Sequence, residues 1–513
     1  MLKKNVISLV VLGIVGLIIG EKLVMSSMTS SPLELNVAFP SKELISKYEP
    51  TNISLDYEYI FLENIFSPLV EINKDGVIEP GVAEKIEWNN DELKLTIRSN
   101  LKTISGRKIT SDDVLFSLKR LLVLSGNTHG NFKDIVCPNV NLKSVEDSCD
   151  GLRKDDSAVY LKAKGGKSFL LPMLSAIDFA VIPRSSVDPK TLKIINYSET
   201  SGVYSVVKQD NDGKIELKMN PHHYFSSDKI PQAINLIPYD TMIAGESLRV
   251  LNEGLVDHIT TVDQSRIDEV LNYSNNNKFD VHVTMKIRTL HALFTNRGLK
   301  ELSSEERRYI ALQLKNAFSE IYKDIKGFES RAEFFPHLSE GGLTPSQQLD
   351  LEKLNSKVSS SLSKKIKVGL LKKSNIEAWS QPILKVLPNA DCYRETNFPE
   401  FKKYEKSEDE PHVFIASTDT GFLEDISLIS YSLNSGILGL EKSKREKWLS
   451  DYMLENDKSK RIQKLKKLHF DALAEPVLVP LIASPYTAIV RKPWKMELSE
   501  LYANNQLWRI KNQ

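Results

Sequence analysis

Strand-like and helix-like stretches alternate along this 513-residue chain, and the alternation restricts its fold more than any other feature. Residues 93–98 alternate apolar and polar side chains with a period of two, which predicts a half-buried strand. Residues 367–371 and 412–416 are short apolar runs that predict buried strands, and the helix-like segment 375–387 separates them. Strands that alternate with helices in this way favour an α/β fold.

Two capping boxes predict where helices begin. Thr110 is followed three residues later by Asp113, and Ser303 is followed by Glu306 at the same spacing. After Thr110, apolar residues recur at helical intervals and give one apolar face, formed by Val114, Leu118, Leu121 and Leu122. The sequence therefore predicts amphipathic helices that start at these two positions.

The N-terminal segment has the pattern of an export signal. Lys3 and Lys4 precede an uncharged, mostly apolar stretch at residues 5–20, which is short for a membrane span. We expect residues 1–30 to be a cleaved signal peptide or, alternatively, an uncleaved anchor that holds the chain through residues 5–20. In both cases the rest of the chain would be exported to a periplasmic or other extracytoplasmic location. No Cys follows the apolar stretch, so a lipid-anchored form is not expected.

Charge and cysteine content narrow the function classes. The 68 basic and 67 acidic residues nearly cancel, so nothing favours a nucleic-acid partner. Cys137 and Cys149 lie twelve residues apart in a polar segment and could close a local disulfide in an oxidising compartment. Cys392 is left over, and we expect it to be a buried thiol. The spacing of the first pair does not suit a metal site, so we expect no metal and no cofactor.

No constellation of residues in the sequence supports catalysis. Residues 165–168, Gly-Gly-Lys-Ser, resemble the end of a phosphate-binding loop, but that motif needs a glycine at position 161, which is Leu. We expect a turn there instead. The chain contains no Gly-x-Ser-x-Gly and no His-Glu-x-x-His motif, so it is not expected to be an enzyme.

Four stretches occur in a fixed order and carry a family resemblance. They are residues 78–88 (IEPGVAEKIEW), 110–120 (TSDDVLFSLKR), 201–206 (SGVYSV) with 220–225 (NPHHYF), and 475–481 (EPVLVPL) with 492–494 (KPW). Together they resemble the oligopeptide- and dipeptide-binding proteins of bacterial ABC importers, the extracellular solute-binding proteins of family five. The resemblance runs from about Leu33 to the C-terminus.

The resemblance implies a two-lobed, periplasmic-binding-protein-like α/β fold of the class II type. A discontinuous large lobe would comprise residues 33–284 and 480–513, and an inserted second lobe would comprise residues 285–479. Two crossover strands would join the lobes, and a ligand would be trapped between them by hinge closure. The protein is expected to be a monomer.

The resemblance also implies which residues contact the ligand. Relatives hold the ammonium group of a peptide with a carboxylate that follows a strand of the second lobe, and the matching residue here is Asp419. The implied ligand-binding set is Asp419, its strand neighbours Ala416, Ser417 and Thr418 as backbone partners, Tyr486 near the C-terminal crossover, and Val37 and Phe39 at the end of the first strand. An aspartate in a loop or helix cap would explain Asp419 as well, and packing at the lobe edge would explain Tyr486.

The function that the resemblance implies is capture rather than chemistry. The chain would be the substrate-binding component of an ABC transporter, binding peptides or similar small solutes outside the cytoplasmic membrane and delivering them to a membrane permease. The alternative is a membrane-anchored protein that keeps the solute-binding fold but has a sensing or scaffolding role. The identity of the ligand does not follow from the sequence, because one fold serves many ligands.

Overall fold

The computed structural model describes residues 33–53, 56–126, 132–241, 243, 245–260, 267–273, 277–325, 327–335, 340–356, 358, 362–370, 376–394, 408–419, 442–503 and 505–513. The expected signal peptide or anchor at residues 1–30, with its apolar stretch at 5–20, lies outside the described residues. Within the described part of the chain, no helix is both long enough and apolar enough to span a membrane.

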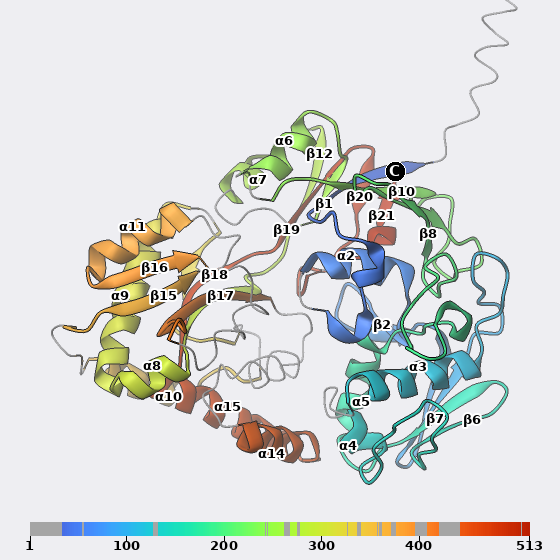
Figure 1. The fold of residues 1–513 in the computed structure, drawn as a ribbon, viewed down its shortest axis with the longest axis horizontal. Helices are drawn as coiled ribbons and strands as arrows, with labels where there is room; N and C mark the ends of the chain where they lie inside the picture. Colours follow the sequence, from blue (N-terminus) through green and yellow to red (C-terminus); the bar gives the residue numbers. More distant parts are fainter. Residues whose placement is uncertain are drawn as a thin grey trace, which may run out of the picture.

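The large lobe is built on a seven-stranded sheet with the order β12-β19-β11-β1-β10-β9-β8 (Figure 1). Its strands are β1 (Glu34–Phe39), β8 (Tyr204–Gln209), β9 (Ile215–Met219), β10 (Ala233–Pro238), β11 (His258–Ile259), β12 (Phe279–Val283) and β19 (Thr487–Arg491). Strand β1 lies in the middle of the sheet and runs parallel to β10 and β11. The helices α2 (Asp56–Ile65), α6 (Glu246–Asn252) and α7 (Ile267–Tyr273) belong to this lobe.

A second, four-stranded sheet forms the far end of the large lobe. Its order is β4-β5-β7-β6, with β4 (Ala83–Asn89), β5 (Glu92–Ile97), β6 (Leu152–Lys154) and β7 (Ala158–Lys162). Three helices accompany it, namely α3 (Ser111–Leu124), α4 (Phe132–Val136) and α5 (Lys167–Leu174). The predicted start of α3 is confirmed, because the Asp113 carboxylate accepts a hydrogen bond of 3.0 Å from the backbone N–H of Thr110. Two short hairpins complete the lobe, β2 (Val70–Ile72) with β3 (Ile78–Pro80) and β20 (Trp494–Met496) with β21 (Ile510–Asn512).

The second lobe is a six-stranded mixed sheet with helices on both faces. The strand order is β14-β18-β13-β17-β15-β16, with β13 (Arg288–Phe294), β14 (Glu329–Ser330), β15 (Ile366–Leu370), β16 (Ala390–Arg394), β17 (Val413–Asp419) and β18 (Leu478–Ser484). The helices are α8 (Asn296–Glu301), α9 (Ser304–Tyr322), α10 (Pro345–Asn355), α11 (Ile376–Val386), α14 (Lys442–Met453) and α15 (Lys458–Ala474). Strands β15 and β17 confirm the two predicted apolar strands. The capping box at Ser303 is also confirmed, since Glu306 and Ser303 exchange hydrogen bonds of 2.8 and 3.2 Å.

Two short crossovers connect the lobes, and one of them lies later in the chain than expected. The outward crossover occupies residues 284–287 between β12 and β13, and the return crossover occupies residues 485–486 between β18 and β19. The boundary expected between residues 479 and 480 falls inside β18, which pairs with β13 in the second-lobe sheet. Pro480 lies within β18 where the register with β13 shifts, and a bulge tolerates proline.

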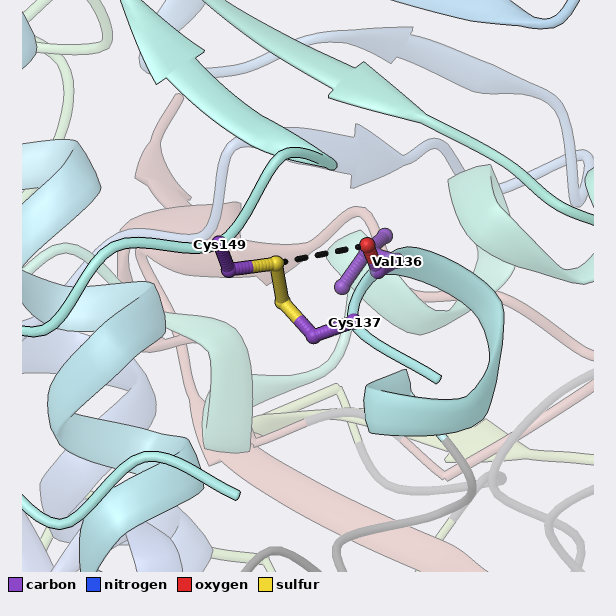
Figure 2. Close-up of a disulfide and its surroundings, with 3 residues drawn as sticks. All are labelled: Val136, Cys137 and Cys149. Carbon is purple, nitrogen blue, oxygen red and sulfur yellow. Dashed lines mark hydrogen bonds between the residues drawn. A yellow bond between two sulfur atoms is a disulfide. The ribbon is translucent and has the colours of Figure 1, made fainter. Parts of the chain in front are cut away.

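A disulfide joins two segments of the four-stranded-sheet region (Figure 2). Cys137 follows α4 and Cys149 precedes β6, and their Cα atoms are 5.8 Å apart. Both side chains are buried in the apolar core of this region. Gly151 lies so close to the carbonyl of Val136 that an added Cβ would be 1.7 Å from its oxygen, so only glycine fits there. The disulfide therefore fastens a tightly packed corner.

The third cysteine is separate from this corner. Cys392 lies on β16 and is half-buried, and burial raises the pKa of its thiol to about 11. A thiol with such a pKa is almost entirely protonated at neutral pH and reacts slowly.

One buried ion pair anchors α3 to the N-terminal part of the lobe. The guanidinium of Arg120 is fully buried and donates two hydrogen bonds, of 3.0 and 2.6 Å, to the carboxylate of Glu49. Its Nε donates a third, of 2.7 Å, to the carbonyl of Leu192. Arg153 makes an equally short bidentate contact with Glu92, but the Arg153 side chain is 53% exposed. The two pairs differ mainly in burial.

We expect Arg120→Met to lower the free energy of unfolding by about 3 kcal/mol, because it leaves a partly buried carboxylate without its partner. Urea unfolding followed by circular dichroism measures the change. Arg153→Met is the matched control, and its effect should be much smaller because an exposed pair contributes little. Equal effects of the two substitutions would contradict a stabilising role of burial at Arg120.

Removal of the disulfide should also be measurable. The bond closes a short loop, and the loop-entropy model assigns such a closure about 3 kcal/mol. We expect the double substitution Cys137→Ser with Cys149→Ser to shift the urea midpoint downward, and Cys392→Ser to leave it nearly unchanged. A double variant as stable as the wild type would show that the folded corner does not depend on the covalent bond.

Candidate ligand-binding site

The strand directions of both sheets point to the region around the two crossovers. In the large lobe, β1, β10, β11 and β12 are parallel, and β12 ends at the outward crossover. In the second lobe, β15, β16 and β17 are parallel, and β17 ends opposite the start of β13. Each sheet therefore directs the carboxyl ends of its parallel strands toward the crossovers, and open α/β sheets bind ligands at such ends.

The two crossovers are hydrogen-bonded to each other. The backbone N–H of Thr284 donates to the carbonyl of Tyr486 at 3.0 Å. In return, the N–H of Tyr486 donates to the hydroxyl of Thr284 at 2.8 Å. Both residues are buried. The two connections between the lobes therefore form one paired element.

Tyr486 lies at the centre of this element. Its hydroxyl donates a hydrogen bond of 3.3 Å to the side chain of Asn505, which belongs to the large lobe. Its ring centroid is 5.7 Å from the guanidinium carbon of Arg288, the first residue of β13. The side chain is 4% exposed, so it packs between the lobes as the structural explanation requires. Ligand contact by Tyr486 stays a prediction.

Asp419 is placed at the same edge of the second-lobe sheet. The antiparallel register sets Asp419 directly opposite Arg288, and Ser484 at the end of β18 flanks Arg288 on the other side. The side chains of Thr418 and Asp419 lie outside the described part of the structure. We call Thr284, Arg288, Asp419 and Tyr486 the crossover site.

Strand β17 pairs with a neighbouring strand on each side. Strand β13 pairs with β17 along its whole length, to Asp419. Among the described residues, β15 pairs with β17 only through Val413, Phe414 and Ile415. The residues that follow β15 in the chain, 371–375, lie outside the described part of the structure. Ala416 is buried and Ser417 is half-buried.

Val37 and Phe39 are placed differently from the other expected ligand-binding residues. Both side chains are fully buried in the apolar core of the large lobe. The ring of Phe39 packs edge-on against Tyr48 and Tyr57, with centroid distances of 6.3 and 5.8 Å. A central strand of a covered sheet buries residues on both faces, which explains this packing. Ligand contact by these two side chains stays a prediction.

Two carboxylates near the crossover site were missed by the sequence analysis. Glu63 is half-buried on α2 and accepts a hydrogen bond from the Asn505 backbone. Asn505 also accepts the hydrogen bond of the Tyr486 hydroxyl, so it links Glu63 to Tyr486. Burial, with a further contribution from the charge of Glu71, raises the pKa of Glu63 to about 8. Burial also raises the pKa of Glu71 to about 7, although Arg509 opposes the shift. An acidic residue inside the apolar run YIFLENIF was the available signal.

Other site chemistry is limited in the described part of the chain. Among the described residues, no three His, Cys, Asp or Glu side chains come together in a way that could hold a metal ion. The buried histidines His258, His291 and His469 have pKa values lowered to about 4, chiefly by burial, and are neutral at physiological pH.

The raised pKa values of Glu63 and Glu71 predict a pH-dependent stability. Because the folded state holds these protons more tightly than the unfolded state, the stabilisation is present below the ordinary pKa of 4.5 and is lost as the pH rises through about 7 to 8. We expect the melting temperature to fall between about pH 5 and about pH 8, and Glu63→Gln to reduce this fall because glutamine carries no charge. Glu305→Gln, at an exposed carboxylate on α9, is the control. An unchanged slope in Glu63→Gln would contradict the assignment.

Comparison with known proteins gives one family match and several similar structures. Residues 77–319 match the family described as bacterial extracellular solute-binding proteins, family 5. The murein tripeptide binding protein MppA of Escherichia coli has a similar structure, with a TM-score of 0.74, 15% identity, and coverage of 94% of this chain and 99% of that one. OppA of Haemophilus influenzae in complex with the peptide RPPGFSPFR gives 0.72, with 15% identity and coverage of 94% and 99%. No curated protein sequence matches the chain.

The arrangement of the lobes also has a counterpart among these structures. The unliganded open form of MppA covers 94% of this chain and 98% of its own, at 14% identity, but its TM-score is only 0.63. Both MppA structures share the fold of this chain. The expected two-lobed α/β fold is confirmed. The central part of this chain therefore matches the bacterial extracellular solute-binding proteins of family 5, and the fold of the solved structures named above extends over nearly the whole chain.

Proposed function

We propose that this chain is the substrate-binding component of an ABC importer and captures peptides or similar small solutes outside the cytoplasmic membrane. The observation that carries the proposal is the crossover site, where both sheets direct the carboxyl ends of their parallel strands toward one paired connection. A ligand that contacts both lobes at this point favours the closed arrangement over the open one. Two similar proteins support this ligand class: MppA is named for binding a murein tripeptide, and OppA was solved in complex with the peptide RPPGFSPFR.

The backbone of β17 suits an extended ligand. The end of β17 reaches the crossovers, where a peptide can add along the strand as a further strand. Main-chain hydrogen bonds of this kind give affinity with little dependence on side chains. We assign Ala416, Ser417 and Thr418 as the backbone partners.

Asp419 supplies the charge that a peptide requires. A free peptide carries an ammonium group, and burying it between the lobes without a partner would be costly. A carboxylate at the end of β17 pairs with it through charge-assisted hydrogen bonds. Tyr486, on the opposite crossover, covers the ligand from the large-lobe side.

The proposal also assigns residues to the two lobes and a partner to the closed protein. The large lobe comprises residues 33–284 and 485–513, and the second lobe comprises residues 285–484. The loaded, closed protein is a monomer that docks on a membrane permease, and the chain itself carries out no chemistry.

Thermal melting with and without a mixture of short peptides tests this function. A ligand at a hundred times its dissociation constant adds about 2.7 kcal/mol, which raises the melting temperature by a few degrees. We expect this shift in the wild type and its loss in Asp419→Ala. Asp391→Ala is the matched control, because Asp391 lies near the opposite, amino-terminal end of a strand in the same sheet. A cooperative melt that no peptide shifts would exclude peptide capture.

A further inference from the structure

A second contact between the lobes lies far from the crossovers. Helices α14 and α15 of the second lobe extend toward α5 of the large lobe, at the end of the molecule opposite β19 (Figure 1). The turn between α14 and α15 begins at Leu454 and meets the turn at Gly165 and Gly166 that precedes α5. Residues separated by almost 290 positions are thereby in contact.

The turn at Gly165 and Gly166 packs closely against the C-terminal end of α14. A Cβ at Gly165 would be 2.8 Å from the Cδ2 of Leu454, and a Cβ at Gly166 would be 2.7 Å from the carbonyl oxygen of Met453. Both glycines have positive φ angles, of 129° and 61°. The Gly-Gly-Lys-Ser stretch that resembled a phosphate loop is therefore a turn shaped to receive α14.

Aromatic and apolar side chains enlarge the contact. The rings of Tyr452 on α14 and Phe169 on α5 are 5.6 Å apart, and the guanidinium of Arg461 on α15 lies 4.9 Å from the ring of Phe169. Leu449, Tyr452 and Met453 are all buried. They belong to one continuous apolar core that includes α3, α5 and the inner face of the second-lobe sheet. Such burial stabilises the contact roughly in proportion to the apolar area removed from water.

We propose that this contact is a latch that holds the two lobes in the closed arrangement without a ligand. The latch consists of Leu449, Tyr452, Met453 and Leu454 on the second lobe and Gly165, Gly166 and Phe169 on the large lobe. The crossovers connect the lobes at one end, and the latch fastens them at the other. A ligand then enters when the latch opens and adds its own contacts to an arrangement that already exists.

An engineered disulfide tests whether the latch forms in solution. The Cβ of Leu454 is 3.7 Å from the position of a Cβ at Gly165, a separation that suits a disulfide. In a Cys392→Ser background without ligand, we expect the pair Gly165→Cys with Leu454→Cys to cross-link. The control pair is Gly106→Cys with Leu454→Cys, because Gly106 also has a positive φ, of 91°, but has no atom within 4 Å of its Cβ position.

The rate of cross-linking shows whether the latch forms in the ligand-free protein. We expect the latch pair to cross-link at least about tenfold faster than the control pair, because its thiols are held at high effective concentration. Non-reducing electrophoresis of protease-treated protein measures the rate. Equal rates would overturn the proposal, because they would show that the contact is not populated in the free protein.

A charge placed in the latch tests whether it holds the lobes together. Leu454 is 39% exposed, so Leu454→Glu brings a carboxylate to the glycine turn without emptying a core. We expect the radius of gyration of the ligand-free protein, measured by small-angle X-ray scattering, to rise. Leu312→Glu is the control, at a similarly exposed leucine of α9 in the same lobe, and it should leave the scattering unchanged. Scattering of Leu454→Glu that is identical to that of the wild type would overturn the proposal.

Discussion

The hydrogen bonds between Thr284 and Tyr486 are the constraint on which the two-lobed architecture depends. They join the two crossovers, which are the only points at which the described chain passes from one lobe to the other. Because each residue is both donor and acceptor across the pair, neither crossover can shift without breaking a buried bond. The carboxyl ends of the parallel strands, the side chain of Arg288 and the position of Asp419 are all arranged around this pair.

Local signals in the sequence predicted the individual elements well. The capping residues Thr110 and Ser303, and the apolar runs that became β15 and β17, are each determined by residues close together in the chain. The discontinuous lobe came only from the family resemblance, because periodicity contains no information on which strands pair. The return crossover lies later in the chain than the resemblance implied, because β18 continues through Pro480, where a register shift in the neighbouring ladder accommodates the proline.

The site was less predictable than the fold, because its members come together only through tertiary structure. Glu63 and Asn505 are more than 400 positions apart, and no pattern in the sequence relates them. The strand end that carries Asp419 could be found from the resemblance, whereas the full burial of Val37 and Phe39 could not, since it depends on the helices and strands that cover β1. Apolar residues at a strand end fit a core and a binding surface equally well.

The disulfide has a consequence beyond the corner that it fastens. Ile135, two residues before Cys137, lies 3.1 Å from the Cβ position of Gly166, and its carbonyl accepts a hydrogen bond of 2.9 Å from Lys164. The disulfide thus holds in place the segment around Ile135, against which the glycine turn at residues 165–166 packs. The bond between the two cysteines thereby also holds in place the surface that receives α14. Loss of the disulfide is therefore expected to loosen the segment against which the glycine turn packs, and not only the corner between Cys137 and Cys149.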